Sequence, residues 1–149
     1  MELAVNKQAY FDYEILDSFE AGLVLTGPEV KSAKRKKIDL KGSYVTVKDD
    51  SLWVVGMHIA PYLPAKGVQK DYHPKQERKL LLHKKEINYL RGQLTRPGLT
   101  IVPLKVYTKS GLIKMEIGLV RGKKKYEKKE KIKKRDIDRE VSRTLKGYQ

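Results

Sequence analysis

The sequence predicts a mainly β fold, a small barrel or sandwich of about six strands with two short helices and a basic C-terminal tail. In the first 120 residues, apolar side chains fall in short runs that alternate with polar ones, as half-buried strands do. Turn-forming residues separate the runs, and two intervening segments have helical spacing instead. Residues 121–149 hold thirteen Lys or Arg against five Asp or Glu, a segment too highly charged to join the core.

The N-terminal part of the chain predicts two strands and a helix. Aromatic and β-branched residues favour strands over Tyr10–Phe19 and Gly22–Leu25. A helix of about three turns is expected to begin at Pro28, because proline suits the first helical position. Glu29 then lies at the positive end of the helix dipole and several basic residues at the negative end, an order that stabilises the helix.

Residues 43–59 predict a β hairpin with its turn at Asp49-Asp50. Val45 and Val47 alternate with polar residues before the turn. In the return strand, one face is expected to carry alternate apolar residues: Trp53, Val55, Met57 and Ile59. Residues 61–76 contain three prolines and many polar side chains, so they predict a loop.

The second half of the chain predicts a helix at about His83–Leu94 and the clearest hairpin of the sequence. The hairpin is expected to turn at Lys109–Gly111, and Pro103 should lie at an edge or a bulge because it lacks an N–H group. Its outward residues include Lys114 and Glu116. The expected core residues are Val102, Leu104, Val106, Ile113, Met115, Ile117 and Leu119.

A chain of 149 residues fits one domain with an appendage, expected at residues 1–120 and 121–149. About six strands of this size close most economically as a small barrel. An oligonucleotide-binding (OB-type) barrel is one solution and a sandwich is another.

The net charge of +15 and the isoelectric point near 9.8 indicate a polyanionic partner, namely RNA, DNA or an anionic membrane. Each phosphate that a Lys or Arg neutralises releases condensed counterions, which favours binding without any base readout. The absence of cysteine is typical of a reducing cytosol. No apolar stretch approaches the ~18–20 residues that span a bilayer, and no export signal is visible, so we expect a cytoplasmic protein that does not enter membranes.

No motif in the sequence predicts a catalytic residue, a metal or a cofactor. The three histidines, His58, His73 and His83, lack metal-ligand spacing. Neither a phosphate-binding glycine loop nor a nucleophile elbow is present. We therefore do not expect an enzyme.

The basic tail predicts a helix that forms only on binding. In a helix, one side would carry Tyr126, Ile137, Val141, Leu145 and Tyr148. This apolar stripe is thin and the charge is dense, so the segment should be mostly unfolded alone and helical against phosphates. A solvated basic tail and a localisation or non-specific nucleic-acid patch are the plainer interpretations.

Cations also surround the three leucines at 80–82. On electrostatic grounds we predict that Arg78, Lys79 and Lys84 contact RNA. The leucines themselves are more typical of core than of an interface.

Several stretches together resemble the small protein B (SmpB) family of transfer-messenger RNA-binding proteins. They run in order along nearly the whole chain: FEAGLVLTGPEVKS at 19–32, SYV at 43–45, IAPY at 59–62, RKLLLHKKEI at 78–87, and VPLKVYTKSGLIKMEIGLVRGKKKYEKKEKIKKRD at 102–136. The resemblance implies an OB-type barrel that binds the tRNA-like domain of transfer-messenger RNA (tmRNA).

The resemblance also implies a role and partners. The protein would deliver tmRNA, charged with alanine and bound to elongation factor Tu, to ribosomes stalled on truncated messages. Its tail would become helical in the empty decoding site and message channel of the small subunit, against ribosomal RNA. Alanyl-tRNA synthetase would be an indirect partner through the RNA, and the protein would be a monomer.

Residue by residue, the resemblance places tmRNA binding at Asn6, Glu20, Leu81 and Lys114. The expected ribosomal contacts of the tail are Gly122, Lys123, Lys124, Tyr126, Glu127, Lys128, Lys129 and Lys131. Two departures stand out. Glu127-Lys128-Lys129 replaces the usual Asp-Lys-Arg, which removes the bidentate fork of an arginine, and Lys36 stands where the first helix usually ends near a glycine.

The alternative function is a general single-stranded RNA-binding or ribosome-assembly protein of OB type. Such a protein would show no preference for a structured tRNA elbow over an unstructured oligonucleotide. A nuclease or phosphotransferase would need a carboxylate cluster or a phosphate loop, and the sequence has neither.

Overall fold

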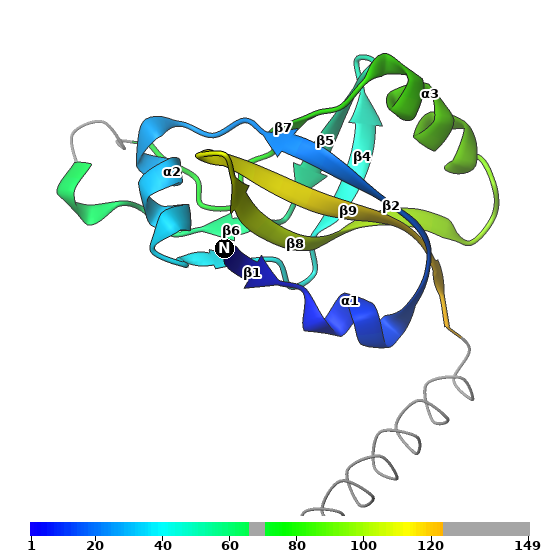
Figure 1. Ribbon diagram of the computed structural model, residues 1–149, viewed down its shortest axis with the longest axis horizontal. Helices are drawn as coiled ribbons and strands as arrows, with labels where there is room; N and C mark the ends of the chain where they lie inside the picture. Colours follow the sequence, from blue (N-terminus) through cyan, green and yellow to red (C-terminus); the bar gives the residue numbers. More distant parts are fainter. Residues whose placement is uncertain (66–70, 124–149) are drawn as a thin grey trace, which may run out of the picture.

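The structure is a computed structural model that describes residues 1–65 and 71–123 (Figure 1). The expected tail helix lies outside these residues, as do the predicted contacts from Lys124 to Lys131. Within the described ranges, no helix is long and apolar enough to cross a membrane.

Six antiparallel strands close into a barrel (Figure 1). The order around the ring is β8 (Leu99–Lys109), β4 (Tyr44–Lys48), β5 (Ser51–Val55), β7 (Arg78–Leu81), β2 (Tyr13–Leu23) and β9 (Leu112–Gly122), and β9 pairs again with β8. β1 (Glu2–Val5) adds to β8, while β3 (Ile38–Asp39) and β6 (His58–Ile59) form a separate pair. The mainly β prediction is confirmed.

Two of the three helices in the described ranges were predicted. α2 (Gly27–Lys34) begins where expected, with Thr26 and Glu29 forming a reciprocal cap, but its eight residues make about two turns, not three. α3 (Lys84–Gln93) agrees with the prediction and has His83 and Leu94 as its flanking residues.

The helix α1 (Lys7–Asp12) corrects the strand expected from Tyr10. Asn6 caps it, because its side-chain oxygen accepts from the N–H of Ala9 at 3.1 Å. The Asn6 amide also donates to the carbonyl of Pro103 at 2.9 Å, which joins α1 to β8.

For the six barrel strands, the prediction was wrong in two places, and these two errors cancel in the number of strands. β2 is one continuous strand, because Gly22 pairs with Lys114 of β9 and with Leu81 of β7 and does not interrupt the ladder. β7 itself was missed. The burial of the return strand β5 also differs from the prediction. Its buried residues are Leu52 and Val54, which lie on the face opposite to the expected one.

Gly56 explains how Met57 and Ile59 are nevertheless buried, as predicted. Its φ of +81° breaks the alternation after β5, so the chain resumes with Met57 and Ile59 inward, both 0% exposed. The loop expected over residues 61–76 contains one short 3-10 turn, η1 (Leu63–Ala65), within its described part.

The β8–β9 hairpin is confirmed with a tighter turn than predicted. Lys109 pairs with Leu112, which leaves the two-residue turn Ser110-Gly111 with φ of +52° and +77°. The predicted irregularity at Pro103 is a register shift between Pro103 and Lys105.

The register shift divides the buried residues of the hairpin between two clusters. Ile101, Val106, Ile113, Met115, Ile117 and Leu119 face the barrel interior, while Val102, Leu104 and Val120 pack against Ala9 of α1. Gly118 faces the second cluster, and a Cβ there would be 2.9 Å from Cδ1 of Leu104. β9 also continues two residues beyond the domain boundary expected after residue 120.

Candidate nucleic-acid interface

Three of the predicted RNA-binding residues converge on one open depression of the barrel surface. Glu20 of β2, Leu81 of β7 and Lys114 of β9 line it, with a volume of about 330 Å³. They are brought together by strand pairing, since Gly22 lies opposite Lys114 on one side and opposite Leu81 on the other. The other lining residues are Gly22, Leu82, His83 and Glu86.

Leu81 is at an outward position of β7 and lies beside Gly22 of β2. A Cβ at Gly22 would be 3.3 Å from Cβ of Leu81, so the bare backbone leaves room for the leucine to lie across β2. The side chain is 55% exposed, whereas the preceding residue Leu80 points inward and is 1% exposed. An exposed leucine beside a cation offers an apolar surface on which a sugar or the face of a base can pack.

Glu20 is an ionised hydrogen-bond acceptor at the rim of the depression. The hydroxyl of Tyr107 donates to Oε2 at 2.5 Å, and Nζ of Lys109 lies 3.2 Å from Oε1. The Tyr107 hydrogen bond and then that of Lys109 lower the pKa of Glu20, and nearby Lys114 adds to this effect. Burial and then the bond to Glu20 raise the pKa of Tyr107, so this hydroxyl stays protonated and donating.

Lys114 is a half-buried cation without a carboxylate partner within 4.0 Å among the described residues. Its neighbour Lys105 differs, because its Nζ is 3.4 Å from Glu116 and 4.0 Å from Glu2. The outer face of β8 and β9 is therefore of mixed charge, and Lys114 leaves its positive charge available to an anion.

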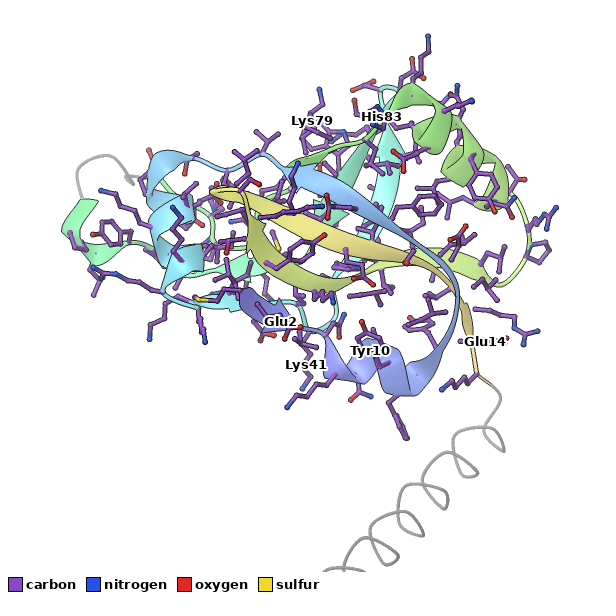
Figure 2. All side chains as sticks on the ribbon, viewed as in Figure 1. Glu2, Tyr10, Glu14, Lys41, Lys79 and His83 are labelled. Atoms are coloured by element: carbon purple, nitrogen blue, oxygen red, sulfur yellow. The ribbon has the colours of Figure 1, made fainter. Side chains whose placement is uncertain are left out.

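Lys79 and Lys84 are exposed, as predicted, but they lie outside this depression. Lys79 of β7, labelled in Figure 2, pairs with Trp53 of β5. Lys84 lies at the start of α3 in a neighbouring open hollow, which it shares with Asp50 and Arg91. Lys79 and Lys84, which are close in the sequence on either side of the three leucines, thus lie at separate places on the surface.

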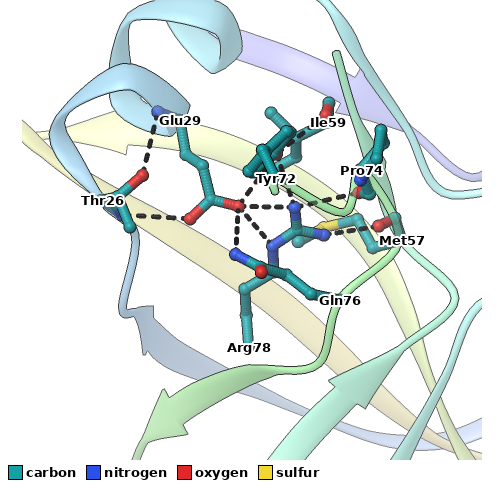
Figure 3. Close-up of polar contacts among 8 residues, drawn as sticks. All are labelled: Thr26, Glu29, Met57, Ile59, Tyr72, Pro74, Gln76 and Arg78. Atoms are coloured by element: carbon teal, nitrogen blue, oxygen red, sulfur yellow. Dashed lines mark hydrogen bonds and ion pairs between the residues drawn. The ribbon is translucent and has the colours of Figure 1, made fainter. Parts of the chain in front are cut away.

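The prediction that Arg78 presents its charge to RNA is wrong. The residue is 3% exposed, and its guanidinium lies against the carboxylate of Glu29, itself 2% exposed (Figure 3). Nε and Nη2 approach the same oxygen of Glu29 at 2.6 and 2.5 Å. The remaining donors reach the carbonyls of Met57 and Pro74 and the hydroxyl of Tyr72, at 2.6, 2.9 and 2.8 Å.

This buried cluster joins α2 to the loop before β7. Burial alone would raise the pKa of Glu29, but the N–H of Thr26, the charge and hydrogen bond of Arg78, and the hydroxyl of Tyr72 together lower it. Burial and the nearby Glu29 raise the pKa of Tyr72 to about 12. Glu29 is thus ionised and Tyr72 neutral, and the cluster serves the fold.

Asn6 is likewise buried, at 6% exposure, and both polar atoms of its side chain are bonded within the protein. Gly122 ends β9 opposite Tyr13. The N–H of Lys123 donates to the carbonyl of Asp12 at 3.0 Å, which fixes the point where the chain leaves the barrel beside α1.

Sequence reasoning missed His83 and Glu86 as lining residues of the depression. The Glu86 carboxylate accepts from the N–H of His83 at 3.2 Å and holds the first turn of α3 against the end of β7. The signal was present as a Glu three residues after the start of the predicted helix. In the described ranges, no three His, Cys, Asp or Glu residues gather closely enough to hold a metal ion.

A small closed β barrel with a strongly positive chain and a cation beside an exposed leucine has the architecture of a nucleic-acid-binding protein. The model of the SmpB protein family matches residues 3–147. The chain is 50% identical to an SsrA-binding protein of Sulfurihydrogenibium sp. (strain YO3AOP1), over 97% of this chain and 94% of that protein. It therefore belongs to the SmpB family, which confirms the resemblance seen in the sequence.

Two further relatives agree in length and fold. An SsrA-binding protein of Ligilactobacillus salivarius (strain UCC118) is 47% identical over 98% of this chain and 93% of its own. A chain from a solved structure of tmRNA–SmpB, concerned with the centre of the bacterial ribosome, matches with a TM-score of 0.67 and 45% identity. That match covers 82% of this chain and 85% of the other.

Proposed function

We propose that this protein binds tmRNA in trans-translation and holds its tRNA-like domain at the depression lined by Glu20, Leu81 and Lys114. One observation carries the proposal. These three residues, far apart in sequence, meet on one exposed surface in a chain whose relatives are named SsrA-binding proteins.

The chemistry of the depression supports binding to folded RNA. Lys114 supplies a charge for a phosphate, Glu20 an acceptor for a ribose hydroxyl or an amino group on a base edge, and Leu81 an apolar contact. This set is small and fixed by three strands, so it suits a defined RNA surface better than a mobile single strand. In this role the protein positions RNA and carries out no reaction of its own.

The ribosome is the second proposed partner. Residues 121–149, with their net charge of +8, would enter the vacant decoding site and message channel of the small subunit, where ribosomal RNA neutralises their mutual repulsion. Elongation factor Tu and alanyl-tRNA synthetase would associate through the RNA, and the protein would act in the cytoplasm as a monomer.

A competition experiment tests the proposal. Full-length protein is titrated into labelled tRNA-like domain, with an unlabelled single-stranded oligonucleotide of equal length as competitor. Lys114→Ala should weaken binding about tenfold, since a hydrogen bond to a charged group contributes ~1.5–3 kcal/mol. The slope of log affinity against log salt concentration should also become smaller by about one. Lys7→Ala, an exposed lysine of α1, is the control and should bind like the wild type.

Equal competition by the single-stranded oligonucleotide would contradict the proposal and favour a general single-strand-binding protein. Cleavage of either RNA in the presence of Mg²⁺ would show that the protein is a nuclease instead. Neither result is expected.

A further inference from the structure

Three outward side chains of β8 form a row beside the depression. They are Lys105, Tyr107 and Lys109, which alternate along the strand with the residues between them. β8 pairs with β9, and β9 pairs with β2, so the row lies one strand from Lys114 and two strands from Glu20 (Figure 1). The depression itself is lined by other residues. A role of the row in RNA binding must therefore act through Lys114 or Glu20.

The row holds two carboxylates that would otherwise repel each other. Glu20 of β2 is directly opposite Glu116 of β9, and like charges opposite each other on neighbouring strands destabilise a sheet. Nζ of Lys105 lies 3.4 Å from the carboxylate of Glu116. The hydroxyl of Tyr107 and the ammonium group of Lys109 hold Glu20 instead. Each carboxylate thus has its own partners on β8.

Most of the acceptor capacity of Glu20 is used by β8. Tyr107 donates to Oε2, and Nζ of Lys109 lies 3.2 Å from Oε1 and 3.3 Å from Oε2. A carboxylate has about four acceptor sites, so these three contacts leave little more than one. The carboxylate is therefore held on the β8 side of its strand, with one position for a further donor.

Lys114 is the cation that Glu20 would otherwise pair with. Gly22 is the residue opposite Lys114, so Glu20 and Lys114 are diagonal neighbours on β2 and β9. Long side chains reach each other across such a diagonal. The charge of Lys114 already contributes to lowering the pKa of Glu20. Nevertheless, no carboxylate of the described residues lies within 4.0 Å of Lys114.

We propose that Tyr107 and Lys109 are positioning residues of the RNA site, which hold the Glu20 carboxylate toward β8 and so keep Lys114 unpaired for a phosphate. The inference rests on the proposed function, because it supposes that RNA binds at the depression. Neither positioning residue has to contact the RNA. A lysine that is paired with a carboxylate offers less positive charge to a phosphate, so the state of Glu20 sets the strength of the Lys114 contact.

Tyrosine suits this task because it donates a hydrogen bond without adding a charge. Burial and the bond to Glu20 raise the pKa of Tyr107, so the hydroxyl remains a donor at neutral pH. Nζ of Lys105 lies 5.9 Å from the centre of the Tyr107 ring, and the attraction between cation and ring helps to fix the ring. Phenylalanine at this position would keep the ring contact and lose only the hydroxyl.

The first test uses Tyr107→Phe in the full-length protein, titrated into labelled tRNA-like domain at several salt concentrations. The affinity should fall about threefold, and the slope of log affinity against log salt concentration should become smaller, although no charge has been removed. A role of Tyr107 in packing alone would not change this slope. Tyr44→Phe removes an exposed hydroxyl from β4 and is the matched control, with wild-type affinity and slope expected.

The second test measures the cost of Lys114→Ala in three backgrounds. In the wild type, the cost should be about tenfold in affinity. In Tyr107→Phe/Lys109→Met, Glu20 is released to pair with Lys114, so the cost should fall to about threefold or less. Adding Glu20→Gln removes the competing charge, and the cost should return toward tenfold. Each cost is a ratio within one background, so a change in stability common to both proteins cancels.

Three results would overturn the inference. If Lys114→Ala costs about tenfold in all three backgrounds, Glu20 does not compete for Lys114, and the proposed function stands without the positioning role. If Tyr107→Phe lowers the affinity with an unchanged salt slope, its hydroxyl acts on the RNA and not on the charge of Lys114. If Lys114→Ala has no effect even in the wild type, the proposed function fails together with the inference.

Discussion

Replacing Arg78 by Met removes a guanidinium group that is 2% exposed and keeps a side chain of similar length. The change leaves the buried Glu29 carboxylate without its cation and removes the donors that reach the carbonyls of Met57 and Pro74. Breaking a buried ion pair by removing one partner costs ~3–5 kcal/mol. Glu29 keeps three other donors, from Thr26, Tyr72 and Gln76, so we expect the lower end of this range.

A loss of about 3 kcal/mol should lower the melting temperature by roughly 10 °C in a domain of this size. Urea unfolding followed by the fluorescence of Trp53, the one tryptophan of the chain, measures the change directly. Lys79→Met is the matched control, because Lys79 is the next residue along β7 and is exposed. Its effect should stay within about 0.5 kcal/mol.

The pH dependence of folding stability tests whether Glu29 is the partner of Arg78. Because the folded state lowers the pKa of Glu29, the carboxylate stabilises the protein above its unfolded pKa of ~4.3, and this contribution is lost as the pH falls through the lower folded pKa. Without Arg78, burial dominates and the folded pKa rises. The stability difference between wild type and Arg78→Met should therefore begin to narrow as the pH falls through the raised folded pKa of the variant, and it should continue to narrow below about pH 4.

The reasoning fails if Arg78→Met unfolds at the wild-type urea concentration and binds RNA as weakly as Lys114→Ala. Arg78 would then be a contact residue, as its charge alone indicates. Removing both partners in Glu29→Gln/Arg78→Met should recover part of the lost stability, which gives the coupling between them.

Two further predictions concern the hairpin and the tail. Gly118→Ala should destabilise the protein by ~1–3 kcal/mol in the same urea assay, because the new methyl group meets the buried Leu104 at 2.9 Å; an unchanged midpoint would mean that α1 is loosely packed. A chain that ends at Lys123 retains the bond from its N–H to Asp12 and should bind the tRNA-like domain nearly as well as the full chain, yet it should not support tagging on stalled ribosomes. Tagging by this truncated chain would refute the role assigned to residues 124–149.

The elements that the sequence predicts well are those defined by local chemistry. The cap of α2 depends on Thr26 and Glu29, three residues apart, and the β8–β9 turn depends on adjacent residues with positive φ. The depression depends instead on β2 pairing with both β7 and β9. Periodicity identifies strands but not their partners, so only the resemblance linked Glu20, Leu81 and Lys114 before the structure did.

The burial of Arg78 could not be predicted from its charge, but the alternation of residues along β7 was enough to predict it. In β7, Arg78 and Leu80 point inward while Lys79 and Leu81 point outward, a strict alternation with period two. The leucines of β7 continue into Leu82, which fits the helical spacing of the following segment, so the strand was not recognised. Its partner Glu29 is also 49 residues away, and on α2 that residue had been explained fully by the helix dipole.

The same ion pair that buries Arg78 also fixes how α2 lies against the barrel. Glu29 is on the inner side of α2, and Arg78 ties it to β7 and, through Met57 and Pro74, to the segments on either side of η1. Tyr62, which holds Lys31 and Arg35, lies between those two anchor points in the chain. A buried ion pair can contribute little net stability compared with apolar packing and still hold α2 in one position relative to the loop around η1. The position of the exposed cations Lys31 and Arg35 is thus a property of the core.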